Sequence, residues 1–255
     1  MDPVSKARAA AAVVERALAG DPGAYVCLTN VHTTMESQSS PALRRAADGA
    51  FLSVPDGMPL VWILRARGHA RTEKVTGIEY IPLVASAGRQ AQIRHFFYGG
   101  GPGVAERAAR RLERLVPGVQ VVGAKSPPYM PLEALPVEDL QEELERTRPH
   151  ILWVGLGAPK QELWMAKTSK DLGVPMMIGV GAGFDYLAGA KPAAPTFLRH
   201  VGLEWAFRLA AEPGRLWRRY LFGNASFVWL LARERFGSPS GVGTRSTGRD
   251  SGMRR

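Results

Sequence analysis

The fold is decided by residues 151–167, which read ILWVGLGAPKQELWMAK. Ile151–Val154 are apolar without polar alternation, a pattern that predicts a strand buried on both faces of a sheet. Gly155–Gly157 then predict a loop in which the backbone can approach another group closely. Pro159 suits the first position of a helix, and it places Gln161–Glu162 in the first helical turn. The stretch therefore predicts a helix that starts at the carboxyl edge of a parallel sheet, where open α/β folds bind ligands.

The same rhythm of strands and helices extends along the chain. Five more short apolar segments predict strands at Tyr25–Leu28, Phe51–Val54, His95–Tyr98, Val119–Val122 and Met176–Val180. Apolar residues at three- and four-residue spacing predict helices over Val4–Leu18, Val104–Leu115, Val137–Arg148 and Gln161–Leu172. This order predicts an α/β fold, with a Rossmann-like, mostly parallel sheet and helices on both of its faces.

The sequence changes character near residue 195. Residues 196–236 mix aromatic residues with arginine and predict a basic, helical appendage to the α/β domain of residues 1–195. Residues 237–255 are small, polar and basic, and they predict a disordered tail. The net charge is +7 over residues 193–255 and +3 over the rest of the chain. A polyanionic partner is therefore expected at the carboxyl-terminal end.

Composition narrows the class of protein. The 255 residues are 45% hydrophobic, which is enough for a substantial core. The single cysteine, Cys27, excludes an internal disulfide and is best explained as a small buried residue of a strand. No run approaches the roughly 18 apolar residues that a membrane span requires, and the charged amino-terminal stretch predicts an amphipathic helix and not a signal peptide. We expect a cytoplasmic protein, soluble or attached only to a membrane surface.

Asp56 is a candidate general base. It follows a predicted strand in Val54-Pro55-Asp56-Gly57, so its carboxylate would project from the carboxyl edge of the sheet toward a bound substrate. Pro-Asp-Gly is also one of the commonest turn sequences, and taken alone the motif favours a turn.

Two more glycine-rich loops follow predicted strands. Gly99 and Gly100 belong to the loop at 98–103, whose backbone N–H groups could bind a phosphate, although a tight turn explains these glycines equally well. The third glycine of the dinucleotide-binding fingerprint is missing from this loop. Asp185, after the loop at 179–183, could accept hydrogen bonds from a sugar or from loop amides.

Several catalytic signatures are missing. The sequence has no Asp-x-Asp, no His-Glu-x-x-His, no Walker motif and no Gly-x-Ser-x-Gly, and its five histidines are scattered. We therefore expect neither a metal nor a cofactor, and a serine hydrolase is disfavoured.

Seven motifs, taken in order, resemble the WecG/TagA/CpsF glycosyltransferases, glycosyltransferase family 26. They are TNVH at 29–32, PDG at 55–57, EKVTG at 73–77, YGG at 98–100, VGLGAPKQE at 154–162, GVGAGFD at 179–185 and GLEWAFRL…EPGRLWRRY at 202–220. The resemblance implies transfer of a hexose-type sugar, such as N-acetylmannosamine, from a UDP-sugar to a polyprenyl-diphosphate-linked sugar. Inversion at the sugar, independence of metal and a place in cell-surface polysaccharide synthesis are implied with it.

The resemblance also implies roles for individual residues. Asp56 would deprotonate the acceptor hydroxyl, while Asn30 and Gln161 would line the sugar-nucleotide pocket, and Glu162 would have a structural role at the helix start. Further substrate contacts are expected from Thr29, Lys74, Gly99, Gly100, Gly157 and Asp185. Lys74 and Ala193 stand where the family usually has arginine, and lysine keeps the charge but loses bidentate phosphate recognition.

The appendage interleaves aromatic residues with arginine, as expected of a helix in an anionic membrane interface. Its arginines could hold the lipid diphosphate or the membrane, or form a solvated basic face; they are Arg208, Arg215, Arg218 and Arg219. The expected partners are the UDP-sugar, the polyprenyl-diphosphate acceptor and the inner face of the plasma membrane, with peripheral attachment and without nucleic acid. The oligomeric state, a homo-oligomer included, stays open. Two alternatives remain, a nucleic-acid-binding module suggested by the basic end and a nucleotide-dependent oxidoreductase, which the missing glycine disfavours.

Overall fold

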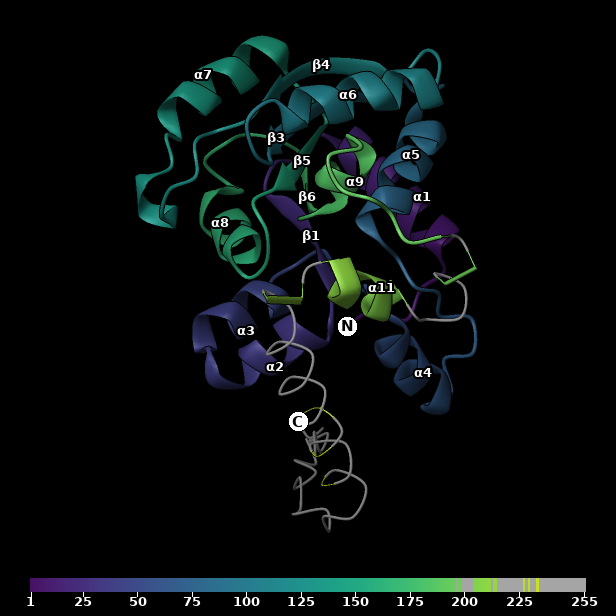
Figure 1. The fold of residues 1–255 in the computed structure, drawn as a ribbon. Helices are drawn as coiled ribbons and strands as arrows, with labels where there is room; N and C mark the ends of the chain where they lie inside the picture. Colours follow the sequence, from purple (N-terminus) through teal and green to yellow (C-terminus); the bar gives the residue numbers. More distant parts are fainter. Residues whose placement is uncertain are drawn as a thin grey trace, which may run out of the picture.

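Six strands form one parallel sheet in the order β2-β1-β6-β5-β3-β4 (Figure 1). The computed structural model describes residues 1–195, 197–198, 204–211, 213–214, 227, 229 and 233. The strands are β1 (Ala24–Thr29), β2 (Leu52–Pro55), β3 (Arg94–Gly99), β4 (Gln120–Lys125), β5 (Ile151–Gly155) and β6 (Met176–Gly179). All six predicted strands and the parallel α/β fold are therefore confirmed.

Helices cover both faces of the sheet (Figure 1). One face carries α1 (Lys6–Ala19), α5 (Gly77–Gly88), α6 (Val104–Leu115) and α9 (Gly183–Leu187). The other carries α3 (Pro41–Asp48), α7 (Glu138–Thr147) and α8 (Lys160–Thr168). The chain also forms α2 (Val31–Ser39), α4 (Met58–Ala66), α11 (Glu204–Ala211) and a single 3-10 turn at Leu132–Ala134. Helix α8 ends four residues before the predicted Leu172, because the chain turns toward Gly173, where φ is +66°.

Strand β5 is buried on both sides, as its apolar run predicts. Ile151 and Trp153 point into the core under α5 and α6, whereas Leu152 and Val154 point into the core under α7 and α8. Cys27 of β1 is buried in the second core, where burial, and then the charge of Glu162, raise the pKa of its thiol. The thiol therefore stays protonated, and its structural interpretation is confirmed.

The topology opens the sheet to ligands at its carboxyl edge. Strands β1 and β6 are neighbours, but the chain leaves β1 toward α3 on one face and leaves β6 toward α9 on the other. Where neighbouring parallel strands diverge in this way, a crevice forms outside their carboxyl ends. Five of the seven motifs, TNVH, PDG, YGG, VGLGAPKQE and GVGAGFD, begin where a strand ends at this edge.

Candidate active site

Asp56 and Asn30 are brought together by the pairing of β1 with β2. Thr29 is paired with Pro55, and the next backbone N–H, that of Asp56, donates to the carbonyl oxygen of Thr29 over 2.7 Å. The hydroxyls of Thr29 and Ser53 are hydrogen-bonded across the same strands, 2.9 Å apart. Because Asn30 follows Thr29 and Asp56 follows Pro55, both polar side chains leave the sheet at the same point of its edge. Both residues are half-buried.

Asn30 also starts helix α2. Its Oδ1 accepts from the backbone N–H of Thr33 over 3.2 Å, and the Thr33 hydroxyl accepts from the backbone N–H of Asn30 over 3.0 Å. This reciprocal capping box fixes the orientation of the Asn30 side chain. The residue that the family resemblance assigns to the sugar nucleotide is thus held in place before a ligand arrives.

Gln161 lies in the first turn of α8 and is buried, with 3% of its surface exposed. Its Nε2 donates to Oε1 of Glu162 over 3.1 Å, while its Oε1 has no hydrogen-bond partner among the described residues. The amide fits against β6 because a Cβ at Gly179 would come within 3.0 Å of Nε2, and one at Gly181 within 3.4 Å of Oε1. Glycines of the 179–183 loop therefore make room for the Gln161 side chain.

Glu162 is as deeply buried as Gln161, at 3% exposed. Its Oε1 accepts the hydrogen bond that orients the Gln161 amide, and its position in the first turn of α8 favours a negative charge. Glu162 therefore does more than start a helix, because its carboxylate fixes the orientation of the Gln161 side chain.

The glycines of the two loops beside β5 differ in their surroundings. Gly157 has φ +79°, and nothing in the described structure lies within 4 Å of a Cβ placed there. In contrast, a Cβ at Gly99 would lie 2.6 Å from the carbonyl carbon of Gly155, and one at Gly100 would lie 2.8 Å from Cβ of Val104. Gly157 leaves room for a ligand, whereas Gly99 and Gly100 are required by packing.

The start of α6, behind Gly99, is already occupied by polar groups. The Ser126 hydroxyl accepts from the backbone N–H of Ala105 over 3.1 Å and donates to Glu106 over 2.9 Å. A side-chain oxygen therefore stands where a bound phosphate would bond to this helix. Sequence reasoning missed Ser126, although a serine directly after β4 is a usable signal for a capping residue.

The start of α5 packs on the segment between β6 and α9. A Cβ at Gly77 would lie 2.8 Å from the carbonyl oxygen of Val180, and one at Gly183 would lie 3.0 Å from Cα of Gly77. Two motifs about 100 residues apart, EKVTG and GVGAGFD, therefore meet backbone to backbone. Asp185 is half-buried in α9, near this contact.

Lys74 is joined to the carboxyl-terminal part of the chain. Its Nζ lies 3.1 Å from Oε2 of Glu204 in α11, and the two side chains are 10% and 16% exposed. Because both side chains are largely buried, salt weakens their attraction less than it weakens a surface ion pair. The pair therefore fixes α11 beside the EKVTG motif. The sequence analysis gave Glu204 no role. The only indication in the sequence was that the GLEW motif carries a negative charge, opposite to that of Lys74.

The remaining predictions concern the appendage, of which only part is described. Arg208 belongs to α11, but its side chain is outside the described part, and Arg215, Arg218 and Arg219 lie outside the described residues altogether. The same holds for the tail at 237–255. No helix within the described ranges is both long and apolar enough to cross a membrane. Nor do three His, Cys, Asp or Glu side chains gather there as a set of metal ligands.

An open parallel sheet with a carboxylate and two side-chain amides at its carboxyl edge is an α/β fold with a candidate ligand-binding edge. The chain belongs to the glycosyl transferase WecG/TagA/CpsF family, whose model matches residues 1–241, and it is therefore a glycosyltransferase. It is 26% identical over 213 residues to the N-acetylglucosaminyldiphosphoundecaprenol N-acetyl-beta-D-mannosaminyltransferase of Bacillus spizizenii. That alignment covers 84% of this chain and 80% of the Bacillus enzyme. Family membership confirms the resemblance and favours it over the nucleic-acid-binding and oxidoreductase alternatives.

Proposed function

We propose that this glycosyltransferase moves N-acetylmannosamine from a UDP-sugar to N-acetylglucosamine carried on a polyprenyl diphosphate. The transferred sugar and the acceptor are those in the name of the Bacillus relative, which aligns with 84% of the chain. The transfer inverts the anomeric centre and proceeds without a metal. The product enters the synthesis of a cell-surface polysaccharide.

The position of Asp56 carries this proposal. The hydrogen bond from the backbone N–H of Asp56 to Thr29 supports this proposal, because it holds Asp56 at the strand end from which the capped Asn30 also leaves. As the acceptor hydroxyl oxygen bonds to the anomeric carbon of the donor, Asp56 takes the hydroxyl proton. The bond from that carbon to the UDP oxygen breaks, and UDP leaves with the electron pair. One displacement with one base inverts the sugar.

The donor would lie along the edge from Asn30 to Gln161. The buried Oε1 of Gln161, which has no partner in the described part of the chain, is an acceptor that a sugar or nucleotide donor group would satisfy, since a buried acceptor without a partner is costly. Gly181 lies beside this oxygen and close to Gly157, where the described residues leave open space for the ligand. Because Lys74 is ion-paired with Glu204 and the pair has no net charge, helix starts such as that of α8 would have to stabilise the departing diphosphate.

The acceptor's lipid requires contact with a membrane, and we propose peripheral attachment through the appendage. The described part of this region exposes Phe197 to 66% and Trp205 to 42%, and Trp62 of α4 is exposed to 54%. Aromatic side chains of this kind bind the interface of a bilayer. Replacing Phe197 and Trp205 by serine should reduce flotation with anionic vesicles. Serine at Tyr129, an exposed aromatic of the β4–α7 loop, is the matched control.

Asp56→Asn tests the proposed chemistry directly. Asparagine keeps the size of the side chain but cannot take a proton, so kcat should fall by about 10²–10⁴-fold while the affinity for the UDP-sugar stays within a few-fold. The measurement is turnover of UDP-N-acetylmannosamine with a short-chain polyprenyl-diphosphate acceptor, together with donor binding by calorimetry.

Asp21→Asn is the control, because Asp21 is largely exposed and lies before β1, at the opposite edge of the sheet. This variant should keep the wild-type kcat. A kcat for Asp56→Asn within threefold of the wild type would remove Asp56 from the chemistry.

A further inference from the structure

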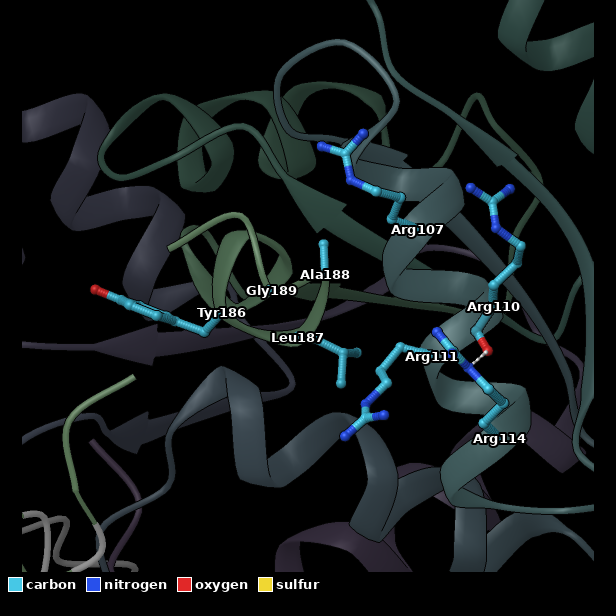
Figure 2. A pocket seen from close by; sticks show the side chains of 8 residues that line it. All are labelled: Arg107, Arg110, Arg111, Arg114, Tyr186, Leu187, Ala188 and Gly189. Carbon is cyan, nitrogen blue, oxygen red and sulfur yellow. Dashed lines mark hydrogen bonds between the residues drawn. The ribbon is translucent and has the colours of Figure 1, made fainter. Parts of the chain in front are cut away.

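Four arginines line a hollow between α6 and α9. They are Arg107, Arg110, Arg111 and Arg114, and the opposite wall is formed by residues 186–189. The hollow has a volume of about 310 Å³. Figure 2 shows that the four arginines come from α6, that Arg111 extends toward Leu187 of α9, and that Arg114 donates back to the carbonyl oxygen of Arg110 over 3.4 Å.

The arginine row is fixed by the packing of α6. Arginines spaced by three, one and three residues lie on one face of a helix, and at 1.5 Å per residue the row spans about 10 Å. The opposite face is anchored in the core by buried residues that include Ala105, Ala108 and Leu112. Helix α6 therefore cannot rotate to disperse these charges.

The charges of the row are not balanced within the described structure. No ion pair there joins any of the four arginines to an acidic side chain, and Glu106 of the same helix bonds to Ser126 instead. Like charges three and four residues apart destabilise a helix. All four side chains are exposed. A hollow lined by uncompensated guanidinium groups attracts an anion.

The arginine row is separate from Asp56. Helix α6 packs on β3 and β4, whereas Asp56 follows β2, four strand positions from β3 in the sheet. With strands about 4.8 Å apart, β2 and β3 are about 19 Å apart. The opposite wall belongs to α9, which follows β6, two strand positions from β2. A ligand held by the arginine row is therefore not the group that reacts at Asp56.

We propose that this hollow binds a ligand that carries two or more phosphate groups. Guanidinium groups bind phosphate oxygens through paired hydrogen bonds, and a row about 10 Å long exceeds what a single phosphate group can engage. Tyr186 and Leu187 provide an apolar wall for the carbon skeleton of the ligand. Phosphates in this arrangement occur in a soluble polyphosphorylated molecule and in anionic lipid headgroups.

The test compares two double variants of the full chain. Arg107→Gln/Arg111→Gln removes two charges from the row, and Arg8→Gln/Arg45→Gln removes two exposed charges from α1 and α3. Tripolyphosphate, titrated calorimetrically at low salt, should bind the row variant at least about tenfold more weakly than the control variant, since charge-assisted bonds are lost. Glutamine preserves helix propensity, and a thermal melt checks that both variants are folded.

Vesicles containing cardiolipin identify the source of the phosphate groups. If the row variant loses only tripolyphosphate binding, the ligand is a soluble molecule. If it loses only vesicle binding, the ligand is a lipid headgroup. Hydrogen exchange adds the location, since the bound probe should protect residues 104–115. Equal binding of both probes by the two double variants, or no protection of residues 104–115 by either probe, would overturn the proposal.

Discussion

The loops after β3 and after β5 look alike in sequence but have different roles in the structure. Both are glycine-rich, both follow a buried strand and both precede a helix. At Gly99 a Cβ would collide with the backbone of Gly155, whereas at Gly157 it would meet no atom within 4 Å in the part of the chain described. Glycine after β3 therefore permits two strand ends to touch, and glycine after β5 keeps a space open.

This difference separates packing from binding at the same sheet edge. The loop after β3 is closed, because Gly100 donates to the carbonyl oxygen of Gly155 over 2.9 Å and Ser126 caps the next helix. The loop after β5 approaches Gly181, which lies beside the buried Oε1 of Gln161, and this oxygen accepts no hydrogen bond from any described residue. A glycine-rich loop thus points to a ligand only where the space beside the glycine is open.

Gly99→Ala should show the largest effect, on stability. Its φ of +126° is strained for alanine, and the new Cβ would lie 2.6 Å from the Gly155 carbonyl carbon. Strain and overpacking together should lower the free energy of unfolding by about 4 kcal/mol. Chemical denaturation with an unchanged m value measures this loss.

Gly101→Ala, in the same loop, is the matched control. Its nearest contact, Cγ2 of Val104, would be an ordinary 3.9 Å away, and its φ is not in the left-handed region. The expected loss is below about 1 kcal/mol. Equal losses in the two variants would contradict the packing role of Gly99.

Acidification should lower the free energy of unfolding through His95 of β3, by an amount between those expected for Gly99→Ala and Gly157→Ala. Burial, and then the charge of His150, lower the pKa of His95 from 6.5 to about 3. The unfolded chain therefore binds a proton that the folded protein excludes, so stability is retained above pH 6.5 and falls as the pH drops toward 3. At pH 5 the loss is about 2 kcal/mol relative to pH 7.

His95→Gln isolates this contribution, since glutamine can still accept the hydrogen bond that Trp153 Nε1 donates to His95 Nδ1 over 3.2 Å. The difference in unfolding free energy between pH 7 and pH 5 should shrink by about 2 kcal/mol in this variant. His69→Gln, at an exposed histidine, should leave the difference unchanged. An unaltered pH dependence in His95→Gln would show that another group is responsible.

The strands were predictable because they are continuous apolar runs, while several helices were not. Helix α2 buries only Thr33 among its nine residues, so it has no apolar periodicity, and its start depends on the Asn30 capping box. Helix α5 contains Pro82 and begins and ends with glycine, which local propensity disfavours. It forms because Tyr80, Ile81 and Val84 are buried in the core against its neighbours.

The site was predictable only in part, for a related reason. That Asn30 and Asp56 lie together follows from the rule that parallel strands end at one edge. The packing role of Gly99 depends on Gly155, and the partner of Lys74 is Glu204, 130 residues away. Contacts between residues far apart in the sequence leave no local pattern. The sequence therefore predicted ligand binding equally for the closed loop after β3 and the open loop after β5.

Gly157→Ala should have a small effect on stability but a distinct effect on donor binding. Alanine at φ +79° costs about 1 kcal/mol, and no described atom stands in its way. If the space beside Gly157 receives the UDP-sugar, the new methyl group should weaken donor binding about tenfold, a loss of about 1.4 kcal/mol.

Gly173→Ala provides the control, because Gly173 has φ +66° and equally open surroundings but precedes β6, at the opposite edge. Both variants should lose similar stability in a denaturation experiment, and only Gly157→Ala should lose affinity in calorimetry with the UDP-sugar. Equal donor affinity in the two variants would mean that the loop after β5 is open without being a binding site.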